Sequence, residues 1–176
     1  VSGVHALWQY NDPITKALIY KIKNTRDKHA AECAGFALYE FLREKLAPVT
    51  NAQPIALIPI PLSHKRLRER GYNQCELIAR AYERIALERD HSHNITVLTD
   101  MLVRMKHRSE QKEKSRSDRL SDSQGIFSIN KIPDSPTNTT YIIVDDVTTT
   151  GSTLDEARRV LEGVGIKSIV PIAIAH

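Results

Sequence analysis

The spacing of apolar residues predicts that the chain begins with two helices. Residues 14–23 and 28–46 carry apolar side chains at helical spacing, and Ile14 is expected on the buried face of the first helix. Pro13 is acceptable at the first helical position because the amide that it lacks would have no partner there. Asp12 is well placed to cap this helix.

From residue 55 onward, apolar runs typical of strands in a parallel sheet alternate with segments at helical spacing. The predicted strands are 55–60, 95–99, 126–129, 141–144 and 166–175, and the predicted helices begin at Asn73 and span 153–163. Pro171 predicts that the last strand is an edge strand or carries a bulge. The order predicts an α/β fold, a mainly parallel sheet flanked by helices, with residues 1–176 as one domain and residues 1–50 as a helical region packed on it.

The net charge of +4 is concentrated in two short stretches. Residues 65–70 have a net charge of +3 and residues 104–119 a net charge of +4, so the remainder is negative. Such a focused positive field suits a polyanionic ligand. Two solvated polar loops are the alternative interpretation.

The two cysteines, Cys33 and Cys75, are far apart and form no C-x-x-C pair. A zinc site built from cysteines alone is therefore excluded, and two buried reduced thiols are expected rather than a disulfide. No apolar run reaches the roughly 18 residues that a membrane span needs, and no signal peptide is visible. A cytoplasmic location is the expectation.

The segment YIIVDDVTTTGST, residues 141–153, carries the strongest chemical signal. A buried strand is followed by Asp145 and Asp146, then by small and hydroxyl residues, and then by a helix. In open α/β sheets, ligands bind beyond the carboxyl ends of the strands. An ordinary strand–turn–helix is the alternative, but the order of these residues favours a ligand site.

The loop after the acids suits a phosphate group. Free amides and the helix dipole favour an anion where the helix begins, and Gly151 lets the backbone approach closely. Hydroxyl groups can donate to phosphate oxygens. The predicted phosphate-binding residues are Val147, Thr148, Thr149, Thr150, Gly151, Ser152 and Thr153.

Asp145 and Asp146 would repel a bare phosphate unless they meet another group. Carboxylates accept strongly from the vicinal hydroxyls of ribose, and a magnesium ion near the pair could screen its charge. The order of acids and phosphate loop therefore predicts a ribose phosphate. The motif G-x-x-x-x-G-K-[ST] is absent, which excludes a Walker-type site.

This strand, acid pair and T-T-G-x-T loop resemble the phosphoribosyl pyrophosphate motif of type I phosphoribosyltransferases. The resemblance implies that Asp145 and Asp146 hold the ribose hydroxyls of phosphoribosyl pyrophosphate. It also implies that residues 148–153 hold the 5-phosphate, with Mg²⁺ as cofactor.

Residues 58–82 narrow the resemblance to the ComF family, most specifically through R-G-Y-N-Q at Arg70–Gln74. Lys21 and Lys23 also fit the helical start of that family. ComF proteins commonly carry an N-terminal four-cysteine zinc module, which is absent from this sequence, so no zinc is expected.

The resemblance also implies roles for the basic stretches. The turn after strand 55–60 is the pyrophosphate loop of type I enzymes, and the residues predicted to bind pyrophosphate are Ile60, Pro61, Leu62, Ser63, Lys65 and Arg66. A flexible loop closes over the ligand in those enzymes, and arginines there could instead bind nucleic acid. The residues assigned to this loop or to nucleic acid are Arg68, Arg70, Arg104, Lys106, Arg108, Gln111, Arg116 and Arg119.

Two functions stay open. The ComF resemblance implies uptake and handling of single-stranded DNA during natural competence, with phosphoribosyl pyrophosphate as ligand or substrate and a helicase-like partner. A metabolic phosphoribosyltransferase of nucleotide salvage is the alternative, since fold alone does not fix function. Transfer activity and oligomeric state remain open.

Overall fold

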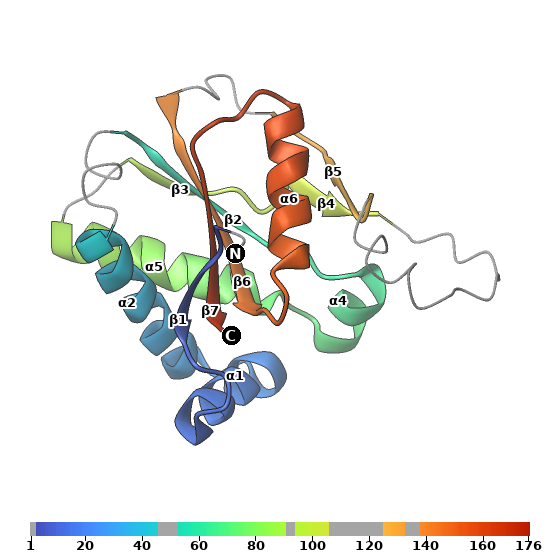
Figure 1. Cartoon of the computed structure of the whole chain (residues 1–176). Helices are drawn as coiled ribbons and strands as arrows, with labels where there is room; N and C mark the ends of the chain where they lie inside the picture. Colours follow the sequence, from blue (N-terminus) through green and yellow to red (C-terminus); the bar gives the residue numbers. More distant parts are fainter. Residues whose placement is uncertain (1–2, 46–52, 91–93, 106–124, 133–137) are drawn as a thin grey trace.

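The computed structural model describes residues 3–45, 53–90, 94–105, 125–132 and 138–176 (Figure 1). Its core is a five-stranded sheet in which every neighbouring pair is parallel. The strand order is β1-β7-β6-β2-β3. The predicted α/β fold with a mainly parallel sheet is confirmed. The strands are β1 His5–Trp8, β2 Ile55–Pro59, β3 Ile95–Val97, β6 Thr140–Val147 and β7 Ile169–Ala175.

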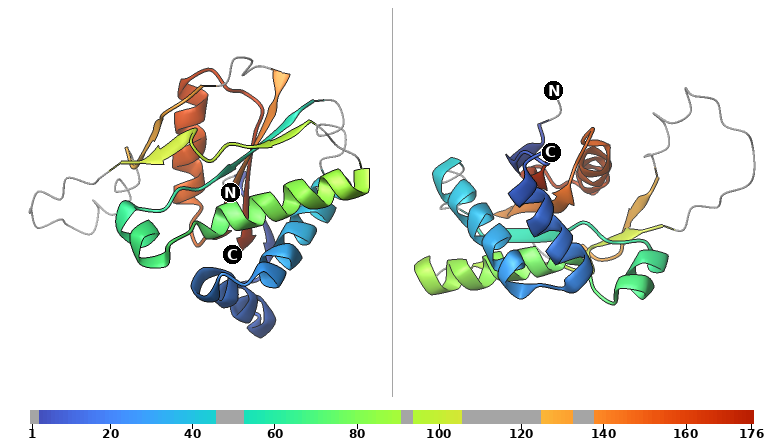
Figure 2. Two further views of the ribbon diagram at one scale, coloured as in Figure 1. Left: turned by 180° about the vertical axis from the view of Figure 1, so that it is seen from behind. Right: turned by 90° about the horizontal axis from the view of Figure 1, so that it is seen from below.

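Helices cover both faces of the sheet, as Figures 1 and 2 show. Helices α1, α2 and α5 lie on one face and share a core with Leu57 and Ile142, whereas α6 packs on the other face with Ile58 and Ile143. The described helices are α1 Pro13–Thr25, α2 Lys28–Lys45, α4 His64–Arg70, α5 Gln74–Asp90 and α6 Ser152–Gly163.

Strand β6 is central, and its apolar residues serve both cores. Ile142 and Val144 belong to one core, Tyr141 and Ile143 to the other, and all four are fully buried. Because successive side chains of a strand point to opposite faces, a strand covered on both faces is continuously apolar. The carboxyl end of this strand is therefore held rigidly in the middle of the sheet.

A small antiparallel pair, β4 Leu102–Arg104 and β5 Phe127–Ile129, extends the molecule beside α6. Gly125 precedes β5, and its amide donates to Glu156 on α6 at 2.6 Å. Glu156 is buried, and the ion pair with Arg159 holds the pKa of its carboxyl below the ordinary value. This contact ties the β4–β5 pair to the helix that follows β6.

The predicted edge position of the last strand is wrong. Strand β7 lies inside the sheet, because β1, which the apolar pattern did not reveal, pairs along its outer side. That pairing begins at Ile172, one residue after Pro171. Pro171 therefore precedes the stretch of β7 that has strands on both sides.

Helix α1 begins as predicted, with Asp12 Oδ1 accepting from the amide of Thr15 at 2.8 Å. Its predicted buried face is wrong at Ile14, which is 77% exposed. The buried positions include Ile19 and Ile22, because α1 joins the core through its later turns. Of the two cysteines, Cys75 is buried as expected, but Cys33 is exposed, and both are free thiols.

Candidate functional site

The acid pair lies within strand β6 rather than after it. Residues Asp145 and Asp146 continue the parallel ladder with β7, which runs to Val147, and they are only 8% and 5% exposed. The strand was predicted to end at Val144, where the apolar run ends. The carboxylates thus form the floor of a site at the carboxyl end of the sheet.

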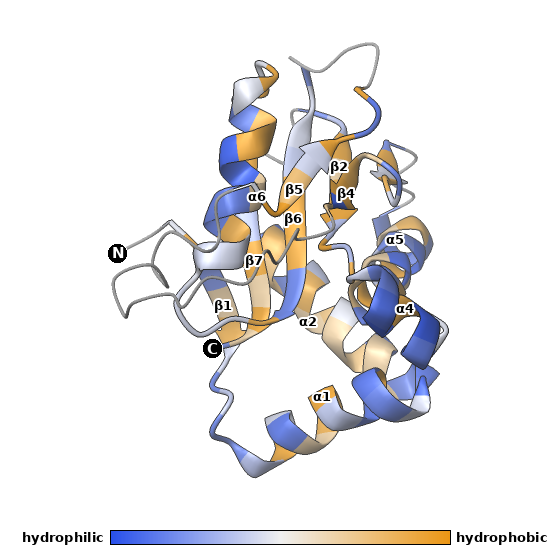
Figure 3. Ribbon diagram, turned by 90° about the vertical axis from the view of Figure 1, so that its right-hand side faces the viewer, coloured by the Kyte–Doolittle hydropathy of each residue, from blue (hydrophilic) through white to orange (hydrophobic). Residues whose placement is uncertain are grey.

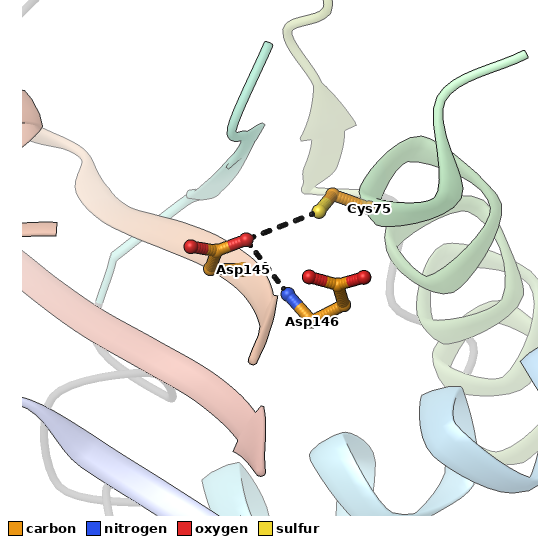
Figure 4. A group of neighbouring side chains, drawn as sticks. All are labelled: Cys75, Asp145 and Asp146. Carbon is orange, nitrogen blue, oxygen red and sulfur yellow. Dashed lines mark hydrogen bonds between the residues drawn. The ribbon is translucent and has the colours of Figure 1, made fainter. Parts of the chain in front are cut away.

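Asp145 is held by two donors (Figure 4). Its Oδ1 accepts from the amide of Asp146 at 2.9 Å and from Cys75 Sγ at 3.5 Å. Burial, together with the charge of Asp146, raises the pKa of Asp145 to about 7. Burial beside the two acids also raises the pKa of the Cys75 thiol, so the thiol stays protonated and donates.

Asp146 is held differently. Its Oδ1 accepts from the amide of Val147 at 2.8 Å, and its Oδ2 lies 3.1 Å from Nζ of Lys23 on α1. Among the described residues, that buried Oδ2 makes no hydrogen bond of normal geometry. One acid of the pair therefore has a cationic partner, while its neighbour relies on neutral donors.

We expect the raised pKa of Asp145 to appear in the pH dependence of stability. Because the carboxyl is protonated more readily when folded, the folded state binds more protons than the unfolded state between the ordinary value of 3.8 and about 7. Stability from this group is present at low pH and is lost as the pH rises through about 7. In thermal and urea unfolding, the free energy of unfolding of Asp145→Asn should therefore rise by roughly 1–3 kcal/mol relative to that of wild type between pH 5 and pH 8. A difference in stability between the two proteins that stays the same from pH 5 to pH 8 would contradict the raised pKa of Asp145.

The loop after β6 leads into α6 through Gly151, whose φ of 81° is left-handed and suits glycine. Thr148 is buried and its Oγ1 accepts from the amide of Gly151 at 3.0 Å. Helix α6 has no side-chain cap, and the amides of Thr150 and Thr153 have no hydrogen bond to other described residues. These amides, with the positive end of the helix dipole, leave room for an anion.

The predicted loop residues occupy three environments. Val147 and Thr153 line the cleft described next, whereas Thr148 and Gly151 are buried in the loop itself. The remaining three, Thr149, Thr150 and Ser152, are exposed to solvent at the same end of the sheet.

A cleft of about 400 Å³ opens over the acid pair. Its volume is within the range of small-molecule sites. Four cationic side chains line it together with the two carboxylates, and burial, with the nearby charge of Arg66, lowers the pKa of Arg104. The lining residues are Lys23, Ile60, Pro61, Leu62, Arg66, Arg70, Gln74, Arg104, Asp145, Asp146, Val147 and Thr153. The cleft therefore joins two charge types, as a ligand with both hydroxyl and anionic groups requires.

The stretch predicted as a basic loop at 65–70 is helix α4, whose residues are largely hydrophilic (Figure 3). Ser63 caps it by accepting from the amide of Arg66 at 3.3 Å, and Gly71 ends it in a left-handed conformation. The polar composition resembled a loop because this helix buries no side chain.

Helix α4 places its basic residues around two further hollows that adjoin the cleft. The side hollow, about 340 Å³, is lined by Lys23, Asn24, Arg66, Glu69 and Arg70. The basic hollow, about 530 Å³, is lined by Ser63, His64, Lys65, Arg66, Arg68, Arg104 and Met105.

Not all predicted anion-binding residues converge. Arg66, Arg70 and Arg104 reach the cleft, but Lys65 and Arg68 face the basic hollow instead. The predicted residues Lys106, Arg108, Gln111, Arg116 and Arg119 lie outside the described residues.

The R-G-Y-N-Q motif joins the parts of the site. Asn73 donates from Nδ2 to the carbonyl of Ile60 at 3.0 Å, and its Oδ1 accepts from the amide of Cys75 at 2.9 Å. Arg70 donates to the side chain of Gln74, which is buried. These contacts fix the turn after β2 against the start of α5.

Tyr72 of the same motif reaches helix α1. Its hydroxyl donates to the carbonyl of Ile22 at 2.8 Å and accepts from the amide of Arg26 at 3.0 Å. The Arg26 guanidinium also lies 5.5 Å from the centre of the Tyr72 ring. The motif therefore holds the end of α1, including Lys23, at the cleft.

The sequence patterns gave no role to Lys23, Cys75, Gln74 or His176. His176 Nε2 lies 3.0 Å from the carbonyl oxygen of Thr149, beside the loop. For Lys23, a signal was present in the ComF-like helical start, but helical spacing alone could not place its side chain against Asp146.

Three side chains of the site offer ligand atoms for a metal ion. One ligand atom from each of Cys75, Asp145 and Asp146 lies within 4.8 Å of the others. A hard cation prefers oxygen to a protonated thiol, so the two carboxylates, directly or through water, are the groups that fit it.

None of the helices within the described ranges is long and apolar enough to cross a membrane.

Comparison with known proteins identifies the family of this chain. Residues 73–176 match the Phosphoribosyl transferase domain family. The chain is 34% identical over 116 residues to Competence protein F of Haemophilus influenzae, and 35% identical over 105 residues to Competence protein ComFC of Bacillus subtilis. These alignments cover 66% and 60% of this chain but only 48% and 37% of those proteins.

Among solved structures, a hypoxanthine phosphoribosyltransferase from Staphylococcus aureus matches with a TM-score of 0.43 and 14% identity, over 81% of this chain and 62% of that one. So weak a similarity adds nothing to the family match. The resemblance drawn from the acid pair and from R-G-Y-N-Q is confirmed by the family match and the two competence proteins. The chain belongs to the phosphoribosyl transferase domain family, with ComF competence proteins among its relatives.

Proposed function

We propose that the cleft binds phosphoribosyl pyrophosphate together with Mg²⁺. The observation that carries this proposal is the convergence of an acid pair, several cations and the open start of α6 on one cleft of about 400 Å³. A sugar bearing two anionic groups needs all three features at once. A bare phosphate would be repelled by the acids.

Each group of the ligand has a matching part of the cleft or of the loop beside it. Asp145 and Asp146 accept from the ribose hydroxyls, and the loop 148–153 takes the 5-phosphate on its hydroxyls and on the amides of Thr150 and Thr153. The turn Ile60–Ser63 with Arg66 takes the pyrophosphate, since arginine offers a planar fork suited to phosphate oxygens. Lys65 faces the adjoining basic hollow and contributes through its charge.

If the bond at ribose C1 is broken, this arrangement favours the reaction. Positive charge grows on the sugar ring, where the carboxylates stabilise it, and negative charge grows on the leaving pyrophosphate. Arg66, Arg70 and Arg104 face that charge. Bound Mg²⁺ would supply further stabilisation of the leaving group.

Titration calorimetry with phosphoribosyl pyrophosphate and Mg²⁺ tests the site. We expect one binding event per chain with a Kd in the micromolar range, about 8 kcal/mol of binding free energy. Ribose 5-phosphate should bind more weakly because it lacks the pyrophosphate. The titration is done at two temperatures, because binding with zero enthalpy at one of them would give no heat. Absence of heat with both ligands at both temperatures would refute the proposal.

The names of the relatives support a role in natural competence. We propose that in this role the protein handles single-stranded DNA with a helicase-like partner. The basic hollow beside the cleft supports such a role, because flexible strands bind basic grooves through their phosphates. A metabolic salvage enzyme is the alternative. Product formation from phosphoribosyl pyrophosphate with a panel of free bases would favour that alternative.

Filter binding of single-stranded DNA at several salt concentrations tests the DNA role. Wild type should lose affinity steeply with salt, and replacing Lys65 and Arg68 by glutamine should reduce the slope by about 1–2. The matched control is Lys21→Gln with Arg43→Gln, which removes two charges from α1 and α2, outside both the cleft and the basic hollow. Equal slopes for the two double variants would argue against this surface.

A further inference from the structure

Lys23 enters the cleft from a part of the chain outside the family match. Its Nζ lies 3.1 Å from Oδ2 of Asp146, an oxygen that is buried and makes no hydrogen bond of normal geometry among the described residues. The side chain of Lys23 is 29% exposed and that of Asp146 is 7% exposed. No second ion pair of Asp146 is present within the described part of the chain. The ammonium group is therefore the charge that compensates the buried carboxylate.

The backbone around Lys23 is held in place on both sides. Tyr72 accepts from the amide of Arg26 and donates to the carbonyl of Ile22, which is fully buried. If the end of the helix moved freely, the entropy cost of holding the lysine in one position would offset much of the stabilisation that an ion pair provides. Here the end of α1 is fixed, so the ammonium is directed into the cleft.

The position of the ammonium bears on metal binding. Asp145, Asp146 and Cys75 offer ligand atoms close enough for one cation to meet all of them, yet Lys23 already holds the free oxygen of Asp146. Arg66 and Arg104 add positive charge around the same space. A free divalent cation would have to displace an ammonium and approach further cations.

We propose that Lys23 is an internal counter-ion that takes the place of a divalent cation on the acid pair of the ligand-free protein. The site thereby rejects free metal and accepts metal that arrives with an anionic ligand. Ligand hydroxyls that donate to Asp146 release the ammonium of Lys23. The released ammonium can then turn toward the carboxylate of Glu69, which also lines the side hollow. The identity of the anionic ligand rests on the proposed function, but the rejection of free metal does not.

Binding of Mn²⁺ alone, followed by the electron paramagnetic resonance signal of the free ion, tests this role without any sugar ligand. Wild type should bind Mn²⁺ weakly, and Lys23→Met should bind it at least about tenfold more tightly because a repelling charge at close range is removed. Lys23→Arg keeps the charge and should behave like wild type. Adding Asp146→Asn to Lys23→Met should abolish the gain.

Lys21→Met is the matched control, since it removes the same charge two residues away, where Lys21 is 61% exposed and pairs with Asp27 at 3.9 Å. If Lys23→Met fails to fold, Tyr72→Phe serves instead. It removes the hydroxyl that holds α1 and should give an intermediate gain in Mn²⁺ affinity.

Equal Mn²⁺ affinity of wild type and the variant, or tight Mn²⁺ binding by wild type, would overturn the inference. Neither result depends on phosphoribosyl pyrophosphate. Failure of the sugar ligand to bind would instead count against the proposed function and leave the role of Lys23 standing.

Discussion

Replacing Asp145 and Asp146 together by asparagine is expected to weaken binding of phosphoribosyl pyrophosphate with Mg²⁺ by at least about 100-fold. Hydrogen bonds to charged groups contribute about 1.5–3 kcal/mol each, and the substitution removes the charge from both acceptors. Asparagine keeps the size of the side chain and can still accept from the amides of residue 146 and Val147. The loss should therefore appear in affinity rather than in folding.

Titration calorimetry of the double variant checks this result at pH 8, above the pKa of about 7 of Asp145. Asp100→Asn is the matched control, because Asp100 is exposed and does not line the cleft. Circular dichroism and a cooperative thermal transition would establish that the variants are folded. A folded double variant with wild-type affinity would exclude the acid pair from ligand binding.

Gly35→Ala is expected to lower the free energy of unfolding by about 1–3 kcal/mol, the usual effect of overpacking. Helix α2 crosses α5 so closely at this point that a Cβ on Gly35 would lie 2.7 Å from Cβ of Ala81 and 2.8 Å from the amide nitrogen of Tyr82. Neither atom belongs to the far end of a flexible side chain, so the helices themselves would have to separate. The higher helix propensity of alanine, up to about 1 kcal/mol, offsets only part of that cost.

Gly163→Ala provides the same substitution in open space, since no atom lies within 4 Å of the Cβ that it would add at the end of α6. In urea unfolding, Gly35→Ala should lower the free energy of unfolding, whereas Gly163→Ala should leave it unchanged or raise it slightly. Equal effects of the two substitutions would show that the approach of α2 to α5 is looser than the structure has it.

Much of the architecture is readable from local pattern, because local pattern reflects local burial. Continuous apolar runs predicted β2 and β6, and periodic runs predicted α1, α2 and α6. Strand β1 has only four residues, two of them exposed, so it lacked a burial pattern to detect. Helix α4 buries no side chain and was taken for a loop for the same reason.

The sequence by itself identified the chemical groups at the end of the sheet. Two carboxylates followed by hydroxyl residues and Gly151 predict a sugar phosphate whatever the surroundings, because these groups are neighbours in the chain and act over a few ångströms. The family resemblance rested on the same short segment and on R-G-Y-N-Q.

Only the tertiary structure decided which distant groups meet that segment. Lys23, Cys75 and Arg104 lie far from Asp146 in sequence, and their approach depends on how α1, α5 and β4 pack around the sheet. Electrostatic interactions depend on separation in space and on burial, and neither can be obtained from spacing along the chain. For that reason the sequence could name the acids, while the fold decided which of them has a cation and which has a pKa near 7.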